Sequence, residues 1–241
     1  MPKMKLYFVP HAGGSAMGYL TMKRFIDPEN VEVVPLELAG RGTRIKEPCY
    51  KSVEEDAKDL YERIKEDIED TDYAIFGHSL GTVITYELTK LIEQNKKPIP
   101  KCLFLSGRGG PGYDMGMPSV ADLPEEEFAS YFIKNQGIPE EMQHSKELMR
   151  LLLPVLRTDV KKAEQYEEKQ VEKITSDIVA VYGVEDNLCN REGMRAWGEL
   201  SNGTYKEYAF SGGHFYFTKH RQELGECIAK VLKTYRVGGD I

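Results

Sequence analysis

The chain has 241 residues, of which 41% are hydrophobic and 29% are charged. This composition is typical of a globular protein and excludes a disordered or collagen-like chain. The 39 acidic residues outnumber the 32 basic ones, which gives a formal net charge of −7. Because nucleic-acid-binding proteins usually carry a basic excess or a basic stripe, and neither is present, we expect no nucleic-acid partner.

Four cysteines lie far apart and form no C-x-x-C pair: Cys49, Cys102, Cys189 and Cys227. Their spacing fits neither a zinc site nor a disulfide framework, so we expect reduced thiols. No apolar run approaches the roughly 18 residues that a membrane helix needs. The sequence therefore predicts a cytoplasmic protein that does not contact a membrane.

Short apolar runs alternate with amphipathic stretches almost from the first residue. The predicted strands span residues 6–10, 31–36, 73–76, 101–105, 178–182 and 205–210. Four of these runs are nearly continuously apolar, as is typical of parallel strands that are covered on both faces. The sequence therefore predicts a mostly parallel central sheet flanked by helices.

Two helices are predicted with particular clarity. Apolar residues recur at helical spacing over residues 52–70, where Ser52 and Glu55 form a capping box at the start. A second helix over residues 80–95 follows the third strand directly and ends before Pro98. Strand and helix thus alternate as they do in a parallel α/β fold.

The segment 113–170 breaks this alternation because it contains only helical patterns, around residues 128–132 and 148–156. Gly137, Pro139 and Pro154 are expected to separate them. An all-helical insert between two parallel strands would lie over the strand ends. We therefore predict one domain, residues 1–241, with a helical lid at 113–170.

The segment 77–81 reads G-H-S-L-G and matches the G-x-S-x-G motif. In this motif the serine lies on a sharp turn between a strand and a helix, which exposes its hydroxyl as a nucleophile. Here the motif lies directly after the strand 73–76 and directly before the helix at residue 80. We predict that Ser79 is the nucleophile; the alternative is a glycine-rich turn without catalytic function.

A serine hydroxyl needs a base, and that base needs a carboxylate to orient it. Asp186 follows the strand 178–182, and His214 follows the strand 205–210. The order serine, acid, histidine is the one found in α/β-hydrolases. We predict that His214 is the base and Asp186 the acid, with Glu185 and Asp159 as alternative acids.

An oxyanion hole needs two backbone N–H groups that point at the developing negative charge. Leu80, which follows the nucleophile, would supply one. The loop 10–14, P-H-A-G-G, follows an early strand, and its Ala12 N–H is our candidate for the other. The alternative is that this loop is only a glycine-rich strand end.

Two other patterns suggest cofactors but lack the required context. Residues 107–112 match G-x-G-x-x-G, but no helix follows them to hold a pyrophosphate. His214 and His220 are six residues apart, which is not the spacing of metal ligands on a helix. We therefore expect neither a metal nor an organic cofactor.

Together these motifs resemble those of the type II (external, editing) thioesterases of nonribosomal peptide and polyketide synthases, within the α/β-hydrolase superfamily. The similar segments are F-V-P-H-A-G-G at 8–14, L-A-G-R-G-T-R at 38–44, F-G-H-S-L-G at 76–81, L-S-G-R at 105–108, D-L-P at 122–124, N-Q-G-I-P at 135–139, L-R-T-D at 156–159 and G-G-H-F at 212–215. Ala39 replaces a proline that is usual in this family. The resemblance covers essentially the whole chain.

The resemblance implies an α/β-hydrolase fold and a serine thioesterase that removes aberrant or short acyl groups. The substrate would be the phosphopantetheine arm of an acyl carrier or peptidyl carrier domain, so the arm belongs to the substrate and is no cofactor. The resemblance also supports Ser79, Asp186 and His214 as the triad, with Ala12 and Leu80 as oxyanion donors. It is compatible with a monomer, and it leaves both the acyl group and the choice between hydrolysis and acyl transfer open.

Two expectations concern the partner and the lid. Because carrier domains are often acidic, docking would need a basic patch, for which Arg41, Arg44 and Arg108 are candidates, or mainly apolar contact. Apolar lid residues would either close over the acyl group or only pack the lid against the body; these are Phe128, Phe132, Leu152 and Leu153. A generalist carboxylesterase of the same fold, or a non-catalytic docking protein, are the alternative functions.

Overall fold

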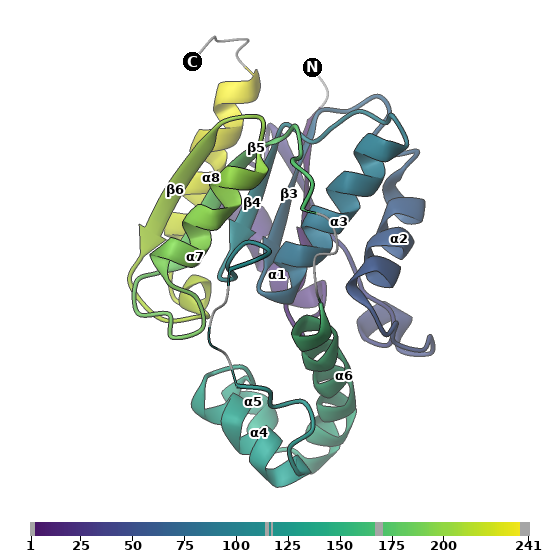
Figure 1. Cartoon of the computed structure of the whole chain (residues 1–241), viewed down its shortest axis with the longest axis vertical. Helices are drawn as coiled ribbons and strands as arrows, with labels where there is room; N and C mark the ends of the chain where they lie inside the picture. Colours follow the sequence, from purple (N-terminus) through teal and green to yellow (C-terminus); the bar gives the residue numbers. More distant parts are fainter. Residues whose placement is uncertain (1–2, 114–115, 117, 167–170, 237–241) are drawn as a thin grey trace.

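Six parallel strands form one sheet in the order β2-β1-β3-β4-β5-β6 (Figure 1). The computed structural model describes residues 3–113, 116, 118–166 and 171–236. The strands are β1 (Met4–Val9), β2 (Val31–Pro35), β3 (Tyr73–His78), β4 (Cys102–Ser106), β5 (Asp177–Gly183) and β6 (Tyr205–Phe210). Each lies within a residue or two of a predicted strand, so the predicted parallel α/β fold is confirmed.

Alternate side chains of the strands enter two separate hydrophobic cores. On β1, Tyr7 and Val9 pack with α2 (Val53–Ile64), α3 (Leu80–Gln94) and α7 (Arg191–Ala196). Leu6 and Phe8 pack on the other face with α1 (Met17–Leu20) and α8 (Arg221–Arg236). Figure 1 shows α2, α3 and α7 in front of the sheet, with α1 and α8 behind it. Both faces are therefore covered, which explains the continuous apolar runs.

Short 3₁₀ helices complete these layers: η1 (Thr21–Arg24), η2 (Gly42–Arg44), η3 (Trp197–Leu200) and η4 (Tyr216–Thr218). No described helix is both long and apolar enough to cross a membrane.

The predicted helix at 52–70 begins as expected but ends six residues early. Ser52 Oγ accepts the Glu55 N–H, and the Glu55 carboxylate accepts the Ser52 N–H, so the capping box is present. The helix α2 ends at Ile64, before a run of acidic residues that the negative end of the helix dipole disfavours. Asp67 in this run accepts hydrogen bonds from Tyr7 and Lys5 instead.

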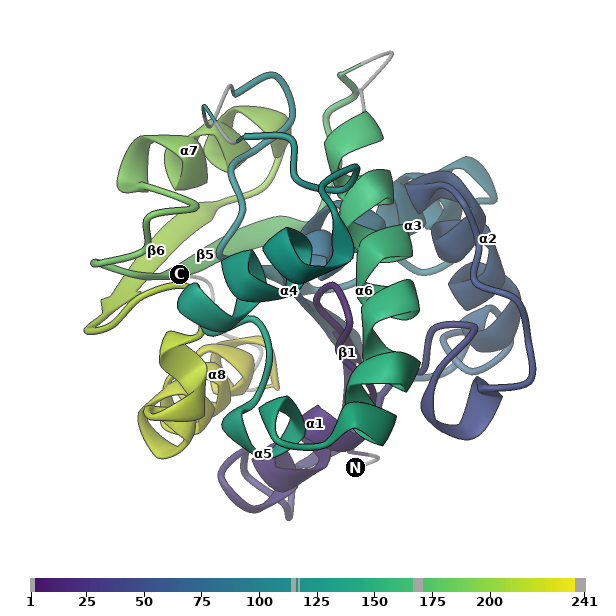
Figure 2. The ribbon, with the colours of Figure 1, turned by 90° about the horizontal axis from the view of Figure 1, so that it is seen from below.

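The described residues between β4 and β5 contain helices and no strand: α4 (Glu125–Lys134), α5 (Glu140–Gln143) and α6 (Lys146–Gln165). They lie beyond the carboxyl ends of the strands, as the view from below shows (Figure 2). They have a hydrophobic cluster of their own around Phe128, Leu153 and Leu156. We call α4–α6 the helical insert.

Pro154 does not separate two helices, contrary to the prediction. The helix α6 runs through it without a break. A proline in a helix interior removes one backbone hydrogen bond. Leu153 and Leu156 on either side are buried in the cluster of the insert, so tertiary packing maintains the helix. Gly137 and Pro139 do lie between α4 and α5, as expected.

Candidate active site

Ser79 lies on the turn between β3 and α3, with backbone angles φ 54° and ψ −116°. A positive φ is unusual for a residue other than glycine. The turn is possible because two glycines allow close backbone contacts. A Cβ on Gly77 would lie 2.3 Å from the Gly81 carbonyl oxygen, and a Cβ on Gly81 would lie 2.3 Å from that of Val9. This is the geometry that the G-x-S-x-G motif requires.

His214 and Asp186 are paired at the ends of neighbouring strands. Both follow their strands, β6 and β5, in short loops. The His214 Nδ1 atom lies 2.9 Å from Asp186 Oδ2, and the other carboxylate oxygen of Asp186 accepts the Leu188 N–H at 2.8 Å. Asp186 is 8% exposed. With Nδ1 held by the carboxylate, Nε2 is the nitrogen left to accept a proton.

Ser79 and His214 line one cavity of about 560 Å³. The side chains of these two residues do not form a hydrogen bond with each other in this structure. In enzymes without substrate this contact is often long and shortens in the complex. The cavity is also lined by Tyr131 and Phe132 of the insert, and by Arg108. It therefore lies between the sheet and the insert.

Ala12 and Leu80 also line this cavity. Leu80 is the first residue of α3, where N–H groups have no acceptor within the helix. Neither the Leu80 nor the Ala12 N–H donates to any other part of the chain that the structure describes. The helix α3 starts beside the end of β1, as the close contact of Gly81 with Val9 shows. Both predicted oxyanion donors are thus available to a ligand.

Two further histidines, His78 and His11, lie against the site, and His11 lines its cavity. His78 is fully buried, and its Nδ1 lies 2.9 Å from the Ser106 hydroxyl, which also contacts the Tyr216 hydroxyl. The His78 ring centroid lies 4.8 Å from that of His214. Burial lowers the pKa of His78 well below its usual value. In the sequence, the only sign that His78 lies at the site is its place within the G-x-S-x-G motif.

His11 is the second of these histidines. Its Nδ1 lies 2.8 Å from the Tyr19 hydroxyl, and its ring packs edge-on against Phe215. Burial lowers the pKa of His11 to about 4, and the neighbouring His214 acts in the same direction. The ring is therefore neutral near pH 7.

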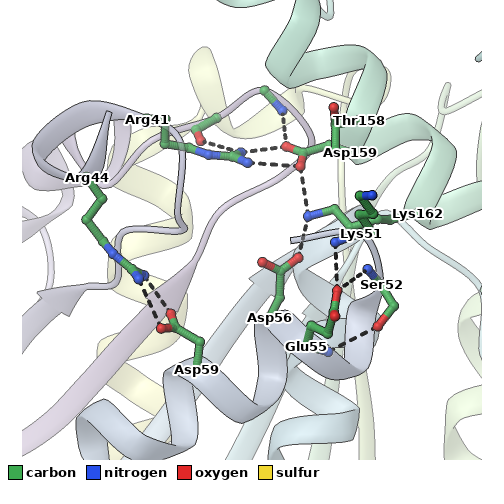
Figure 3. A network of polar contacts seen from close by, with 12 residues as sticks. Arg41, Arg44, Lys51, Ser52, Glu55, Asp56, Asp59, Thr158, Asp159 and Lys162 are labelled. Carbon is green, nitrogen blue, oxygen red and sulfur yellow. Dashed lines mark hydrogen bonds and ion pairs between the residues drawn. The ribbon is translucent and has the colours of Figure 1, made fainter. Parts of the chain in front are cut away.

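Neither alternative acid reaches His214. Asp159 instead binds Arg41, Lys162 and the Gly13 N–H (Figure 3). Glu185 is exposed, and the carboxylate that contacts the histidine is that of Asp186. The structure therefore brings Asp186, and not Asp159 or Glu185, to the predicted base.

Two of the three candidate residues for a basic docking patch are buried in ion pairs. Arg41 is 6% exposed and paired with Asp159, while Arg44 is 8% exposed and paired with Glu47 and Asp59. Figure 3 shows Arg41 directed at Asp159 and Arg44 directed at Asp59. Arg108 lines the cavity and donates to the Ala163 carbonyl at 3.0 Å. Arg41 and Arg44 therefore offer no basic surface for docking, whereas Arg108 remains at the cavity.

The apolar insert residues divide into two groups. Phe128 and Leu153 are buried in the cluster of the insert, so they pack it together. Phe132 lines the catalytic cavity, and Leu152 lies against the Gly13 loop.

As for metals, no cluster of three or more potential ligands occurs among the described residues.

The parallel sheet with a serine on the strand-to-helix turn, and a histidine paired with an aspartate at the same edge, has the form of a serine hydrolase of the α/β-hydrolase class. The chain matches the family model of the thioesterase domain over residues 4–232. It therefore belongs to the thioesterase family, and it is a thioester hydrolase.

The similarity to individual proteins extends over nearly the whole chain. Thioesterase PikA5 of Streptomyces venezuelae is 32% identical over 237 residues, which cover 98% of this chain and 84% of that protein. The gramicidin S biosynthesis protein GrsT of Aneurinibacillus migulanus is 30% identical over 231 residues, which cover 96% of this chain and 90% of that protein. The crystal structure of ClbQ from the colibactin NRPS/PKS pathway matches with a TM-score of 0.92 and 30% sequence identity. The match covers 99% of this chain and 100% of the ClbQ chain.

Proposed function

We propose that this thioesterase removes aberrant or short acyl groups from the phosphopantetheine arms of carrier domains in a nonribosomal peptide or polyketide synthase. The main support is the similarity over nearly the whole chain to ClbQ of the colibactin NRPS/PKS pathway and to GrsT of gramicidin S biosynthesis. The carrier domain is thus the partner, and its blocked arm is the substrate.

The site residues have defined roles in this proposal. His214 takes the proton of Ser79 as the hydroxyl attacks the thioester carbonyl, and Asp186 holds the imidazole tautomer and stabilises its charged form. The N–H groups of Ala12 and Leu80 stabilise the oxyanion. The thiol of the arm leaves with a proton from His214, and an acyl group remains on Ser79.

Deacylation uses the same groups in a second step. His214 accepts a proton from water, the hydroxide attacks the acyl carbonyl, and the carboxylic acid is released with regeneration of Ser79. No step requires a metal or an organic cofactor, and one chain supplies all these residues. Phe132 and Tyr131 of the insert lie where an acyl group on Ser79 would extend, since they line the same cavity.

The test compares an acetyl-loaded carrier domain with a small free acetyl thioester, using intact-protein mass spectrometry of the carrier. Wild-type protein should deacylate the carrier much faster than the free thioester at equal concentration. Ser79→Ala should abolish turnover, with a loss of several orders of magnitude, and remain folded. Ser211→Ala is the matched control, because its exposed hydroxyl contacts His220 outside the catalytic cavity.

Two outcomes would contradict the proposal. Equal Ser79-dependent rates on the carrier and on the free thioester would show a thioesterase without a carrier partner. Activity on small oxygen esters alone would favour a generalist carboxylesterase of the same fold.

A further inference from the structure

Four charged side chains form a buried network between the insert and the body of the protein (Figure 3). Arg41 bonds Asp159 through both terminal nitrogens, one of them at 2.9 Å from Oδ1. Lys162 lies 3.0 Å from the same Oδ1 and also binds Asp56 on α2. Each of these side chains is at most 6% exposed. The two positive and two negative charges balance, as buried charges require.

This network ends at the loop that contains the predicted oxyanion donor. The Gly13 N–H donates to Asp159 Oδ2 at 2.8 Å, and Arg41 Nη1 donates to the Gly14 carbonyl at 3.3 Å. Asp159 belongs to α6 and Gly13 to the loop after β1, so the contact joins residues that are 146 positions apart. One carboxylate therefore connects the insert to the active-site loop.

The contact fixes the orientation of the Ala12 N–H through the geometry of a turn. The Gly14 N–H donates to the His11 carbonyl at 2.9 Å, and Gly13 has φ 72°, as the third residue of a type II turn requires. The His11 carbonyl and the Ala12 N–H belong to one planar peptide unit. Asp159 holds the Gly13 N–H, and Arg41 holds the Gly14 carbonyl. Because these groups belong to the same turn, the two contacts also fix the direction of the Ala12 N–H.

We propose that Asp159 is a positioning residue of the oxyanion hole, which acts through Gly13 to aim the Ala12 N–H at the reacting carbonyl oxygen. The inference rests on the proposed function, because that function assigns Ala12 to the oxyanion. It gives Asp159 a task distinct from that of Asp186, which already occupies His214 Nδ1.

The electrostatics keep the carboxylate charged for this task. Burial alone would favour the neutral acid, but the hydrogen bonds from Arg41 and the charges of Arg41 and Lys162 hold the pKa of Asp159 below its usual value. A charged acceptor makes a shorter and stronger hydrogen bond to an N–H than a neutral one does. The Gly13 unit is therefore held more firmly than by an ordinary side-chain contact.

We call the hydrogen bond from the Gly13 N–H to Asp159, which Arg41 supports, the clamp. Packing from the same helix, α6, supports this clamp. A Cβ placed on Gly13 would lie only 3.0 Å from Leu156 Cδ1 and 3.3 Å from Leu152 Cδ1. The loop is thus enclosed by α6 on one side and held by Asp159 from the same helix. The insert therefore contributes to the chemical step as well as to the wall of the cavity.

The test uses two charge-balanced double variants that differ only in which carboxylate is lost. Asp159→Asn with Lys162→Met weakens the clamp, because the amide has one acceptor oxygen and presents its NH₂ group to Arg41. Asp56→Asn with Lys162→Met removes the distant carboxylate and leaves the clamp in place. Both proteins are assayed on the acetyl-loaded carrier well below their unfolding temperatures, beside wild type and Ser79→Ala.

The Asp159 variant should lose at least tenfold in kcat with little change in KM, since loss of one oxyanion donor outright costs on the order of 10²–10³ in kcat. Its affinity for an alkyl trifluoromethyl ketone, which forms an oxyanion on Ser79, should fall by a similar factor. The Asp56 variant should stay within about threefold of wild type in both measurements. If the Asp159 variant does not fold, Asp159→Glu keeps the charges but shifts the carboxylate relative to the Gly13 N–H, and it should show the same selective fall in kcat.

Equal kcat values and equal ketone affinities in the two double variants would overturn the inference, because the network would then serve stability alone. If wild type itself shows no Ser79-dependent deacylation, the proposed function fails instead. The two failures are therefore distinguishable in one experiment.

Discussion

Ser79 adopts a backbone conformation that costs on the order of 1–3 kcal/mol outside a supporting structure. Two hydrogen bonds hold it there: its N–H donates to the Ser106 carbonyl at 2.8 Å, and its carbonyl accepts the Thr82 N–H at 3.0 Å. The strand β4 and the helix α3 thus fix both sides of the residue. The consequence is a serine whose position does not depend on its own side-chain packing.

At the same scale, Asp186 can be tested apart from its neighbour. Asp186→Asn should lower kcat on the order of 10³–10⁴-fold, because the amide NH₂ would favour the wrong tautomer of His214. KM should change little, since Asp186 does not line the catalytic cavity. The measurement is steady-state hydrolysis of an acetyl thioester by the purified variant.

Glu185→Gln is the matched control for this substitution. Glu185 is adjacent in sequence but exposed. The Glu185→Gln protein should retain wild-type kcat. A loss in Glu185→Gln as large as that in Asp186→Asn would reverse the assignment of the acid.

Among the elements, the strands β1, β3, β4 and β5 were predictable because they are almost entirely buried, which leaves a continuous apolar run in the sequence. Helix ends were less predictable. The apolar spacing continues to Ile68, which is buried, although α2 ends at Ile64. Apolar periodicity reports which side chains are buried, and a turn can bury a side chain as well as a helix does.

In the candidate site, too, some residues could be predicted from local sequence and others could not. Ser79, Asp186 and His214 can be singled out from the sequence because each follows a predicted strand within a few residues, and parallel strands end at one edge of the sheet. The pairings of Arg41 with Asp159 and of Arg44 with Asp59 could not be predicted, since these carboxylates come from other elements of the fold. A pairing across more than a hundred residues, such as that of Arg41 with Asp159, leaves no local pattern in the sequence.

The capping box of α2 offers a prediction for an element as a whole. Ser52→Ala removes the hydroxyl that accepts the Glu55 N–H, and it should lower the free energy of unfolding by about 1 kcal/mol. The urea midpoint should fall while the m-value stays constant. Ser52→Thr retains a hydroxyl and should lie close to wild type. If alanine and threonine destabilise equally, the hydrogen bond is not the source of the effect.

For the molecule as a whole, the interior of the active-site side contains histidines that must stay neutral. His78 and His11 both have pKa values lowered by burial, and their rings lie close enough to interact, with centroids 5.8 Å apart. An unfolded chain would protonate each of them near pH 6.5. Folding thus excludes protons from these sites, which couples the stability of the protein to pH.

The sign of this coupling follows from the lowered pKa of His11. Between pH 6.5 and about 4 the unfolded state binds more protons than the folded state, so stability is present above pH 6.5 and is lost as the pH falls. From pH 7 to pH 5, His11 alone should cost about 2 kcal/mol. Asp56, whose pKa burial raises to about 6, contributes with the opposite sign.

Comparison with His11→Asn isolates this contribution, because His78 and Asp56 titrate in both proteins. The asparagine can still contact the Tyr19 hydroxyl, and it does not titrate in this range. Urea unfolding at pH 7 and at pH 5 should show a loss of stability on acidification that is about 2 kcal/mol smaller in the variant than in wild type. Parallel losses in the two proteins would mean that His11 gains a proton in the folded state as readily as in the unfolded chain. The cavity would then admit enough water or anion to solvate a charged ring in the loop 10–14, and the acid sensitivity of the protein would come from His78 and the carboxylates.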